Sequence, residues 1–219
     1  MDNESTIKVV HDYVRSNSNE DISAHDWWHI HRVFETATKI AEVEGGNLFV
    51  IQMIALLHDV YDHKFHPEVD IAQEIIGLLE RLGVFTHIDN SDLVNITHSI
   101  CNLSFKGGFN KEKLSIEGQI AQDADRLDAI GAIAIARTFA YGGKMDRAIY
   151  DPTEGIIDVV DERQYVTTAR HSINHFYEKL LKLKDLMNTE TGKKMALRRH
   201  QFMEDYLKQF FAEWHGVDF

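Results

Sequence analysis

One apolar segment constrains the fold of this chain more than any other feature of its sequence. From Phe49 to Leu57 every residue except Gln52 is apolar, so the helix that we expect over about 48–62 would be hydrophobic on nearly every side. Such a helix must be surrounded by other helices, because it has no polar face to present to water. The segment is also too short to cross a bilayer, which needs roughly 20 apolar residues. It predicts the centre of a soluble helical bundle that is not integral to a membrane.

The remainder of the chain also has the helical period. Apolar residues recur at spacings of three and four, and the 219 residues include only two prolines. The predicted fold class is therefore all-α, with a single domain over 1–219. We expect breaks at the glycine pairs 45–46, 107–108 and 142–143, and a mobile loop over 142–161. Besides the helix over 48–62, we expect helices over about 4–15, 28–44, 69–82, 91–102, 117–141, 162–186 and 191–214.

Charge and cysteine content limit the partners of the chain. Thirty-five acidic and twenty-three basic side chains give a formal net charge of -12, and such a field repels extended nucleic acid. A small phosphorylated substrate is still allowed, because a bound divalent cation can reverse the potential locally. The single cysteine, Cys101, excludes an internal disulfide framework, and the start of the chain shows no secretory signal pattern. We therefore expect a cytoplasmic protein without a membrane partner, and a homodimer is left open.

The His-Asp dipeptide occurs three times, in different surroundings. His11-Asp12 lies on an amphipathic segment beside charged residues, where a solvated helix face is the simpler interpretation. His58-Asp59 directly follows the apolar segment, and burying its imidazole and carboxylate is costly unless something pairs with both. A divalent cation would pair with both groups. The structural alternative is a helix C-terminal histidine that the helix dipole favours, with Asp59 capping nearby groups.

The surroundings of this second pair resemble the HD-domain phosphohydrolase superfamily. The tract His-Ile-His-Arg-Val begins at His29, Leu-Leu-His-Asp ends at Asp59, and Asp-Ala-Asp-Arg-Leu-Asp-Ala occupies 123–129. In that family a histidine on one helix, an adjacent His-Asp pair on the next and a distant aspartate hold a divalent metal inside a helical bundle. The resemblance therefore implies an HD-type bundle in which the metal ligands are His29, His58, Asp59 and Asp125.

The resemblance is closest to small stand-alone bacterial HD hydrolases. These proteins carry tracts like His-Asp-Trp-Trp-His over 25–29, Gln-Asp-Ala-Asp-Arg-Leu-Asp-Ala-Ile-Gly-Ala over 122–132 and Ala-Arg-Thr-Phe-Ala-Tyr-Gly-Gly over 136–143. The resemblance implies a metal-binding core over about 23–143, with C-terminal helices over 161–214 that complete the bundle.

Two departures from other HD enzymes narrow the activity. Those that hydrolyse the guanosine alarmone carry Glu-Asp three residues after the aspartate of the motif, whereas this chain has Asp62-His63 there. The paired histidines and the Gly-Tyr-Pro tract of the cyclic dinucleotide phosphodiesterases are also missing, and the corresponding region is Thr97-His98-Ser99. The resemblance therefore disfavours the alarmone as substrate and implies a site for a single metal ion.

The implied ligand set indicates the chemistry. Two imidazoles and two carboxylates suit manganese, magnesium, nickel, iron or zinc, and the ligand types do not choose among these metals. The implied activity is that of a phosphatase or phosphodiesterase that attacks a small phosphate ester, with a nucleotide preferred, by a metal-activated water. Asp62, four residues after His58, is the first candidate to orient that water. The candidates to bind the phosphate are Arg32, Lys64 and Arg126, and each has a surface charge as its alternative.

Four further side chains have both a functional and a structural interpretation. Trp27 and Trp28 could stack on a nucleobase, although aromatic residues at the start of a helix more often pack in the core. His171 and His175 have the spacing of a metal-binding pair. Because their surroundings offer no acidic partner in a motif, we expect them on a helix surface.

Two other functions are compatible with the same ligands. A di-iron oxygenase of the HD type would need extra ligands, for which His63, His66 and His98 are the candidates. A non-catalytic metal- or nucleotide-binding module would use the centre for stability or sensing. In each case Asp123 or Asp128 could hold a histidine ligand in place through its second ring nitrogen.

Overall fold

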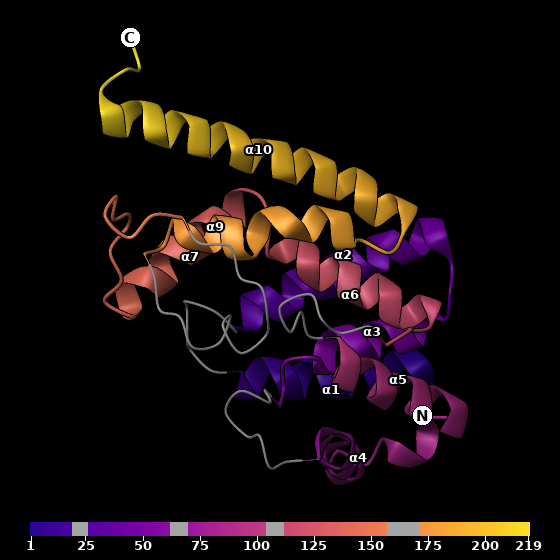
Figure 1. Cartoon of the computed structure of the whole chain (residues 1–219). Coiled ribbons are helices and arrows are strands. Elements are labelled where there is room, and N and C mark those ends of the chain that lie inside the picture. Colours follow the sequence, from indigo (N-terminus) through magenta and orange to yellow (C-terminus); the bar gives the residue numbers. More distant parts are fainter. Residues whose placement is uncertain (19–25, 62–69, 104–111, 157–170) are drawn as a thin grey trace. The chain divides into compact units, whose positions relative to one another are not determined.

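The chain is helical throughout the part that the structure describes. The computed structural model describes residues 1–18, 26–61, 70–103, 112–156 and 171–219, and in these ranges it contains helices and no strand (Figure 1). The all-α prediction is confirmed. None of the described helices has both the length and the hydropathy that crossing a membrane requires. The chain forms two compact units, one made of 1–106 and 110–125 and the other of 107–109 and 126–219.

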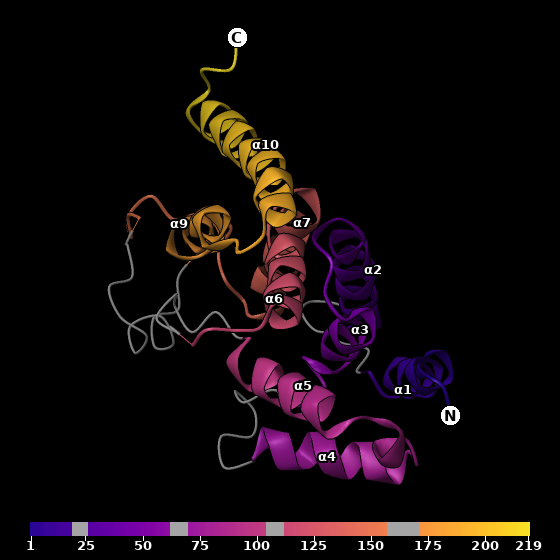
Figure 2. The same cartoon turned by 90° about the vertical axis from the view of Figure 1, so that its right-hand side faces the viewer.

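The first unit is built around α3 (Leu48–Leu57). This helix packs against α1, α2 and α5 (Figure 2), and α4 packs against α5. Eight of its side chains are buried, and each buried Val, Leu, Ile, Met or Phe contributes about 1.5–3 kcal/mol. The predicted central helix is therefore present. The other elements that contribute to this unit are α1 (Asn3–Asn17), α2 (Trp27–Glu44), α4 (Ile71–Arg81), η1 (Phe85–His87), α5 (Asn90–Asn102) and α6 (Ile116–Asp128) as far as Asp125.

The central helix is shorter than predicted at its C-terminal end. It ends at Leu57, with His58 as its cap, and the Val60 N–H donates to the Leu57 carbonyl at 3.2 Å, as in a 3₁₀ turn. The expectation of a helix through residues 58–61 is therefore wrong. The side chains of the two residues after the helix nevertheless come close to each other, since the His58 Nε2 lies 3.5 Å from the Asp59 Oδ2. Asp62 lies outside the described residues.

A helix cap and one half-buried carboxylate fix the helices that carry the polar motifs. The Asp26 Oδ1 accepts a hydrogen bond from the His29 N–H at 2.9 Å, which starts α2 and places His29 in its first turn. The Glu117 carboxylate at the start of α6 accepts hydrogen bonds from the Asn47 N–H at 3.0 Å and from the Asn95 Nδ2 at 3.1 Å. Burial raises the pKa of Glu117, but these hydrogen bonds lower it more. They tie α6 to the starts of α3 and α5.

The second unit differs from the prediction at two glycines. The predicted single helix over 117–141 is broken at Gly131, whose φ of 90° is in the left-handed region and which packs against the side chain of Arg199. Gly142 is not a break but lies in the last turns of a helix. A Cβ there would lie 2.1 Å from the Ser172 Oγ, so the packing of Ser172 requires a glycine at this position. The elements after α6 are α7 (Ala132–Lys144), α9 (Asn174–Glu178), η3 (Leu180–Leu186) and α10 (Glu190–His215).

The predicted helix over 162–186 is interrupted in its described part. Residues 172–173 form a turn, α9 is short, and a 3₁₀ helix follows it. Lys179 separates α9 from η3, because its backbone, with φ −135° and ψ −63°, departs from helical geometry. The final helix, α10, begins at a cap in which the Thr189 hydroxyl accepts from the Gly192 N–H at 2.9 Å, and it packs along η3 and α7. Residues 157–170 lie outside the described residues. They include the end of the loop predicted over 142–161 and the beginning of the helix predicted over 162–186.

Candidate metal centre

Four side chains from three distant segments of the sequence meet in the first unit. His29 comes from the first turn of α2, His58 and Asp59 from the end of α3, and Asp125 from the last turn of α6. The two imidazole Nε2 atoms lie 3.3 Å apart. The Asp59 Oδ2 lies 3.2 Å from the His29 Nε2 and 3.5 Å from the His58 Nε2. The Asp125 Oδ1 lies 3.5 Å and 3.8 Å from the same two nitrogens.

These separations are suited to a single metal ion. Ligand atoms about 2.1 Å from one ion, in a tetrahedral arrangement, lie about 3.4 Å from one another. The measured separations, from 3.2 to 3.8 Å, bracket that value. Ligand atoms of His29, His58 and Asp125 all lie within 4.8 Å of one another, so the fold brings these three predicted ligands close enough to share one ion. The part of Asp59 as the fourth ligand stays a prediction.

A backbone hydrogen bond selects the tautomer of His58. Its Nδ1 lies 2.9 Å from the carbonyl oxygen of Ala55, and a carbonyl oxygen can only accept, so the Nδ1 carries the proton. The Nε2 of the neutral ring then has a lone pair, which points at the other three groups. This is the arrangement that metal-binding histidines have, with one ring nitrogen held by the protein and the other facing the metal. Sequence reasoning missed Ala55, because the group involved is a backbone carbonyl.

Burial increases the need for a cation. The side chains of His29 and His58 are 4% and 3% exposed, whereas those of Asp59 and Asp125 are 16% and 30% exposed. The imidazoles therefore form the floor of the site and the carboxylates lie nearer to water. Holding two carboxylates against two buried imidazole lone pairs is unfavourable without a positive charge among them. The donor set fits a divalent ion.

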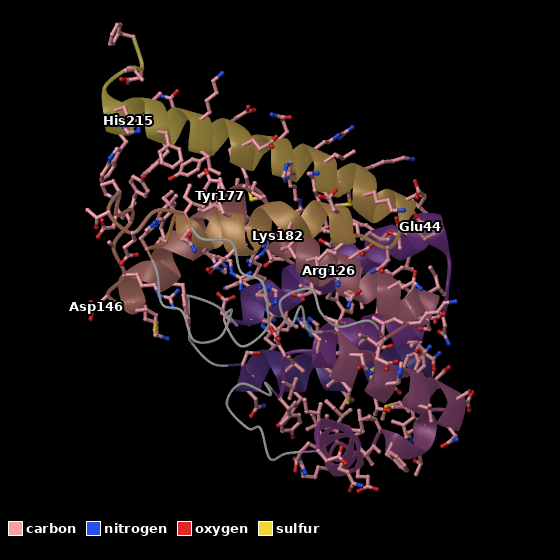
Figure 3. The ribbon with its side chains drawn as sticks, in the orientation of Figure 1. Glu44, Arg126, Asp146, Tyr177, Lys182 and His215 are labelled. Atoms are coloured by element: carbon pink, nitrogen blue, oxygen red, sulfur yellow. The ribbon has the colours of Figure 1, made fainter. Side chains whose placement is uncertain are left out.

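The predicted phosphate-binding residues have different surroundings. Arg32 is half-buried on α2, one turn after His29. The Nη1 of Arg126, labelled in Figure 3, donates a hydrogen bond to the carbonyl of Leu186 in η3, within the second unit. The other two predicted catalytic residues, Asp62 and Lys64, lie outside the described residues.

The two aspartates near Asp125, Asp123 and Asp128, also have different surroundings. Asp128 is paired with Arg137, whose Nη1 lies 2.6 Å from the Asp128 Oδ2 in the second unit. Asp123 is completely buried in the first unit, which holds the presumed ligands. That one of the two supports a histidine ligand stays a prediction, and the complete burial of Asp123 in the unit with the presumed ligands favours Asp123.

The extra histidines that a second ion would need are not brought to this centre by the described part of the chain. His98 is exposed on α5 and is not part of the metal-competent group of described residues. His63 and His66 lie outside the described residues.

The geometry agrees with a family comparison. The family model described as HD domain matches residues 27–130, a range that includes all four presumed ligands. The chain belongs to the HD-domain family, so the resemblance seen in the sequence is confirmed.

Individual relatives match the chain over nearly its whole length. The uncharacterized protein YpgQ of Bacillus subtilis is 38% identical over 209 residues, which are 94% of this chain and 92% of YpgQ. A crystal structure of YpgQ in complex with ADP has a TM-score of 0.74 at 32% identity and covers all of both chains. An HD-superfamily hydrolase from Bacillus thuringiensis has a TM-score of 0.74 at 42% identity, covering 98% of this chain and 99% of that one. A Lactobacillus plantarum protein has a TM-score of 0.84 at 38% identity, covering 99% and 100%.

Proposed function

We propose that this protein is a metal-dependent phosphohydrolase that acts on a small phosphate ester, with a nucleotide as its substrate. The observation that carries the proposal is the convergence of the ring nitrogens of His29 and His58 with carboxylate oxygens of Asp59 and Asp125. The relationship to an HD-superfamily hydrolase supports hydrolysis. The complex of the relative YpgQ with ADP supports a nucleotide.

The four converging residues would hold the ion. Manganese, magnesium, nickel, iron and zinc all remain compatible with two imidazoles and two carboxylates. When bound, a divalent ion supplies a water of lowered pKa and neutralises charge on the phosphoryl oxygens. The protein's own part is to direct the Nε2 of His58 toward the ion by holding its Nδ1 on the Ala55 carbonyl, and to keep the two buried rings in place.

Arg32 is the phosphate-binding candidate that we favour. It belongs to the same unit as the presumed ligands and lies one helical turn from His29, so its guanidinium is carried by the element that positions the site. A guanidinium can donate two parallel hydrogen bonds to phosphate oxygens. Arg126 already donates to the Leu186 carbonyl, which makes an anchoring role sufficient for it. Asp62 remains our candidate to orient the water, and Lys64 a second candidate for the phosphate.

The test is a substrate screen with defined metal content. The full-length protein would be loaded in turn with manganese, magnesium, nickel, iron and zinc, and assayed on nucleoside mono-, di- and triphosphates, cyclic nucleotides and sugar phosphates. We expect phosphate release that depends on the metal and stops with a chelator. A metal-loaded protein that cleaves no member of the panel contradicts the proposal. Binding of nucleotides without turnover would then favour the binding module, and two irons per chain by elemental analysis would favour the oxygenase.

A further inference from the structure

The two consecutive tryptophans of α2 lie in opposite environments. Trp27 is half-buried and packs against the core of the first unit. Trp28 is 59% exposed, although an indole is among the largest apolar side chains. The sequence offered core packing and base stacking as alternatives for both residues. The structure separates them, because only Trp28 keeps a large part of its ring in contact with water.

Trp28 is braced along one side rather than buried. The His31 ring contacts it edge-on, with ring centroids 5.9 Å apart and an interplanar angle of 80°. The same His31 ring stacks on Trp27 at 5.8 Å and 28°, and Trp27 in turn receives the edge of His11 at 4.8 Å. These contacts connect the exposed indole to the core through two further rings. The indole is therefore supported from the core while much of it remains accessible.

On the surface of α2, the indole of Trp28 is connected to the metal centre through one intervening residue. Arg32 lies three residues after His29 and four residues after Trp28, and both spacings make neighbours on a helix surface. His29, Arg32 and Trp28 consequently form one strip around the first turns of α2. The strip begins at a buried presumed metal ligand, continues through a half-buried cation and ends at an exposed aromatic ring.

We infer that Trp28 is a specificity-determining residue whose indole stacks on the base of the nucleotide substrate. The inference rests on the proposed function and deepens it, because it concerns what distinguishes a nucleotide from other phosphate esters at the same site. The order along the strip matches the order within a nucleotide, whose phosphate and base are at opposite ends of a ribose. Stacking on an indole tolerates every base, since each base has a π face. The site therefore selects for the presence of a base rather than for its identity.

The test compares two ligands that differ only in the base. AMP and ribose 5-phosphate would be titrated into the manganese-loaded protein by calorimetry, with kcat/KM used instead for any ligand that is turned over. We expect Trp28→Ala to lower the preference for AMP over ribose 5-phosphate roughly tenfold, and Trp28→Phe to lower it less, since one base stacked on an aromatic ring is worth that order of affinity. The matched control is Trp214→Ala, which removes an indole that is 47% exposed on α10. Its preference should equal that of the wild type.

The outcomes separate this inference from the proposed function. An unchanged preference in Trp28→Ala overturns stacking, and so does an equal loss of both ligands, which would indicate that the indole only supports the helix. A wild-type protein that prefers AMP through Trp28 but hydrolyses no phosphate ester would keep the stacking and overturn the proposed function. A wild-type protein that hydrolyses both ligands without preferring AMP would keep phosphohydrolysis and overturn the stacking.

Discussion

The two units each contain a cluster of histidines and carboxylates, and the clusters are built differently. In the first unit, His29, His58 and Asp125 come from three helices that are far apart in sequence. In the second, the His175 Nδ1 lies 2.8 Å from the Glu178 Oε1 three residues later. Beside it, the His171 Nδ1 accepts a hydrogen bond from the Asn174 N–H at 3.0 Å. One cluster is assembled by tertiary structure and the other by a single short helix.

The difference shows what distinguishes a metal centre from a structural cluster. In the first cluster a backbone carbonyl occupies the Nδ1 of His58, so the Nε2 is left to face other ligand atoms. In the second, both Nδ1 atoms are engaged by groups within three residues. The lack of an acidic partner in the motif predicted a helix surface for His171 and His175, but His171 is buried and accepts a hydrogen bond from the first N–H of α9. Among the described residues, only the ligand atoms of His29, His58 and Asp125 come close enough to one another to hold one ion.

The largest expected effect is on catalysis. Asp59→Ala should lower kcat for a nucleotide by at least about 1000-fold, because losing a metal ligand forfeits several kcal/mol of activation and each 1.4 kcal/mol is about tenfold. Glu178→Ala, the matched acid of the second cluster, should stay within roughly twofold of the wild type because it is an independent site. Kinetic assays with excess manganese, together with circular dichroism to verify folding, would measure both. Comparable losses in the two variants would remove the functional distinction between the clusters.

The next effect is on stability. If metal is present at 100 times its Kd, chelation should remove about 2.7 kcal/mol from the free energy of unfolding. For a chain of this size that corresponds to a fall in Tm of about 5–10 °C, measured by thermal melting with and without EDTA. In Asp59→Asn the chelator should have little effect, whereas Glu178→Gln should respond like the wild type. A wild-type Tm that EDTA leaves unchanged would argue against a resident ion.

Most of the fold could be predicted from local sequence, and the exceptions have tertiary causes. Helical periodicity predicted the central helix because Phe49 to Leu57 are apolar all round, a property of the segment itself. It missed the break at Gly131 and the continuation through Gly142, since these depend on the packing of Arg199 and Ser172 against the two glycines. Neither partner is near its glycine in sequence. Contacts of this kind leave no periodic signal.

The candidate site also has features that the sequence predicts and features that only the tertiary structure reveals. The order of the motifs was sufficient to single out His29, His58, Asp59 and Asp125, which the fold then brings together. The tautomer of His58 was beyond the sequence, because it depends on a backbone carbonyl one turn earlier.

A moderate effect should follow from removing the hydrogen bond that His171 accepts at the start of α9. His171→Ala deletes the acceptor for the buried Asn174 N–H, and a buried donor left without its partner costs about 1–3 kcal/mol. His171→Asn is the matched variant, because the Asn side chain keeps an acceptor oxygen at the same distance along the side chain, so it should recover part of that stability. Urea denaturation of both variants would measure the difference, and the EDTA-dependent change in Tm should be the same in both. If His171→Ala instead abolished that change, the two clusters would be coupled.

The smallest expected effect is a pH dependence that belongs to the second cluster alone. Burial lowers the pKa of His175 from 6.5 and outweighs its hydrogen bond to Glu178, which acts to raise it. The native state therefore binds fewer protons than the unfolded state, and the stability associated with neutral His175 is complete above pH 6.5 and declines as the pH falls below it. Burial raises the pKa of Glu178, but the hydrogen bonds from His175 and Asn174 lower it by more, so the net shift is downward from 4.5. The stability associated with ionised Glu178 is therefore lost only below pH 4.5.

Denaturation of metal-free protein at pH values from 7.5 to 5 would isolate the contribution of His175. The stability of the wild type relative to His175→Gln should be greatest near neutral pH and should shrink as the pH falls, because only the wild type must protonate a half-buried imidazole whose pKa is lowered. Glu178→Gln should leave that trend in place above pH 5, since the carboxylate of Glu178 is ionised there in both states of the wild type. A difference between wild type and His175→Gln that stays constant over this range would contradict the prediction. It would mean that His175 takes up a proton as easily in the folded protein as in the unfolded chain.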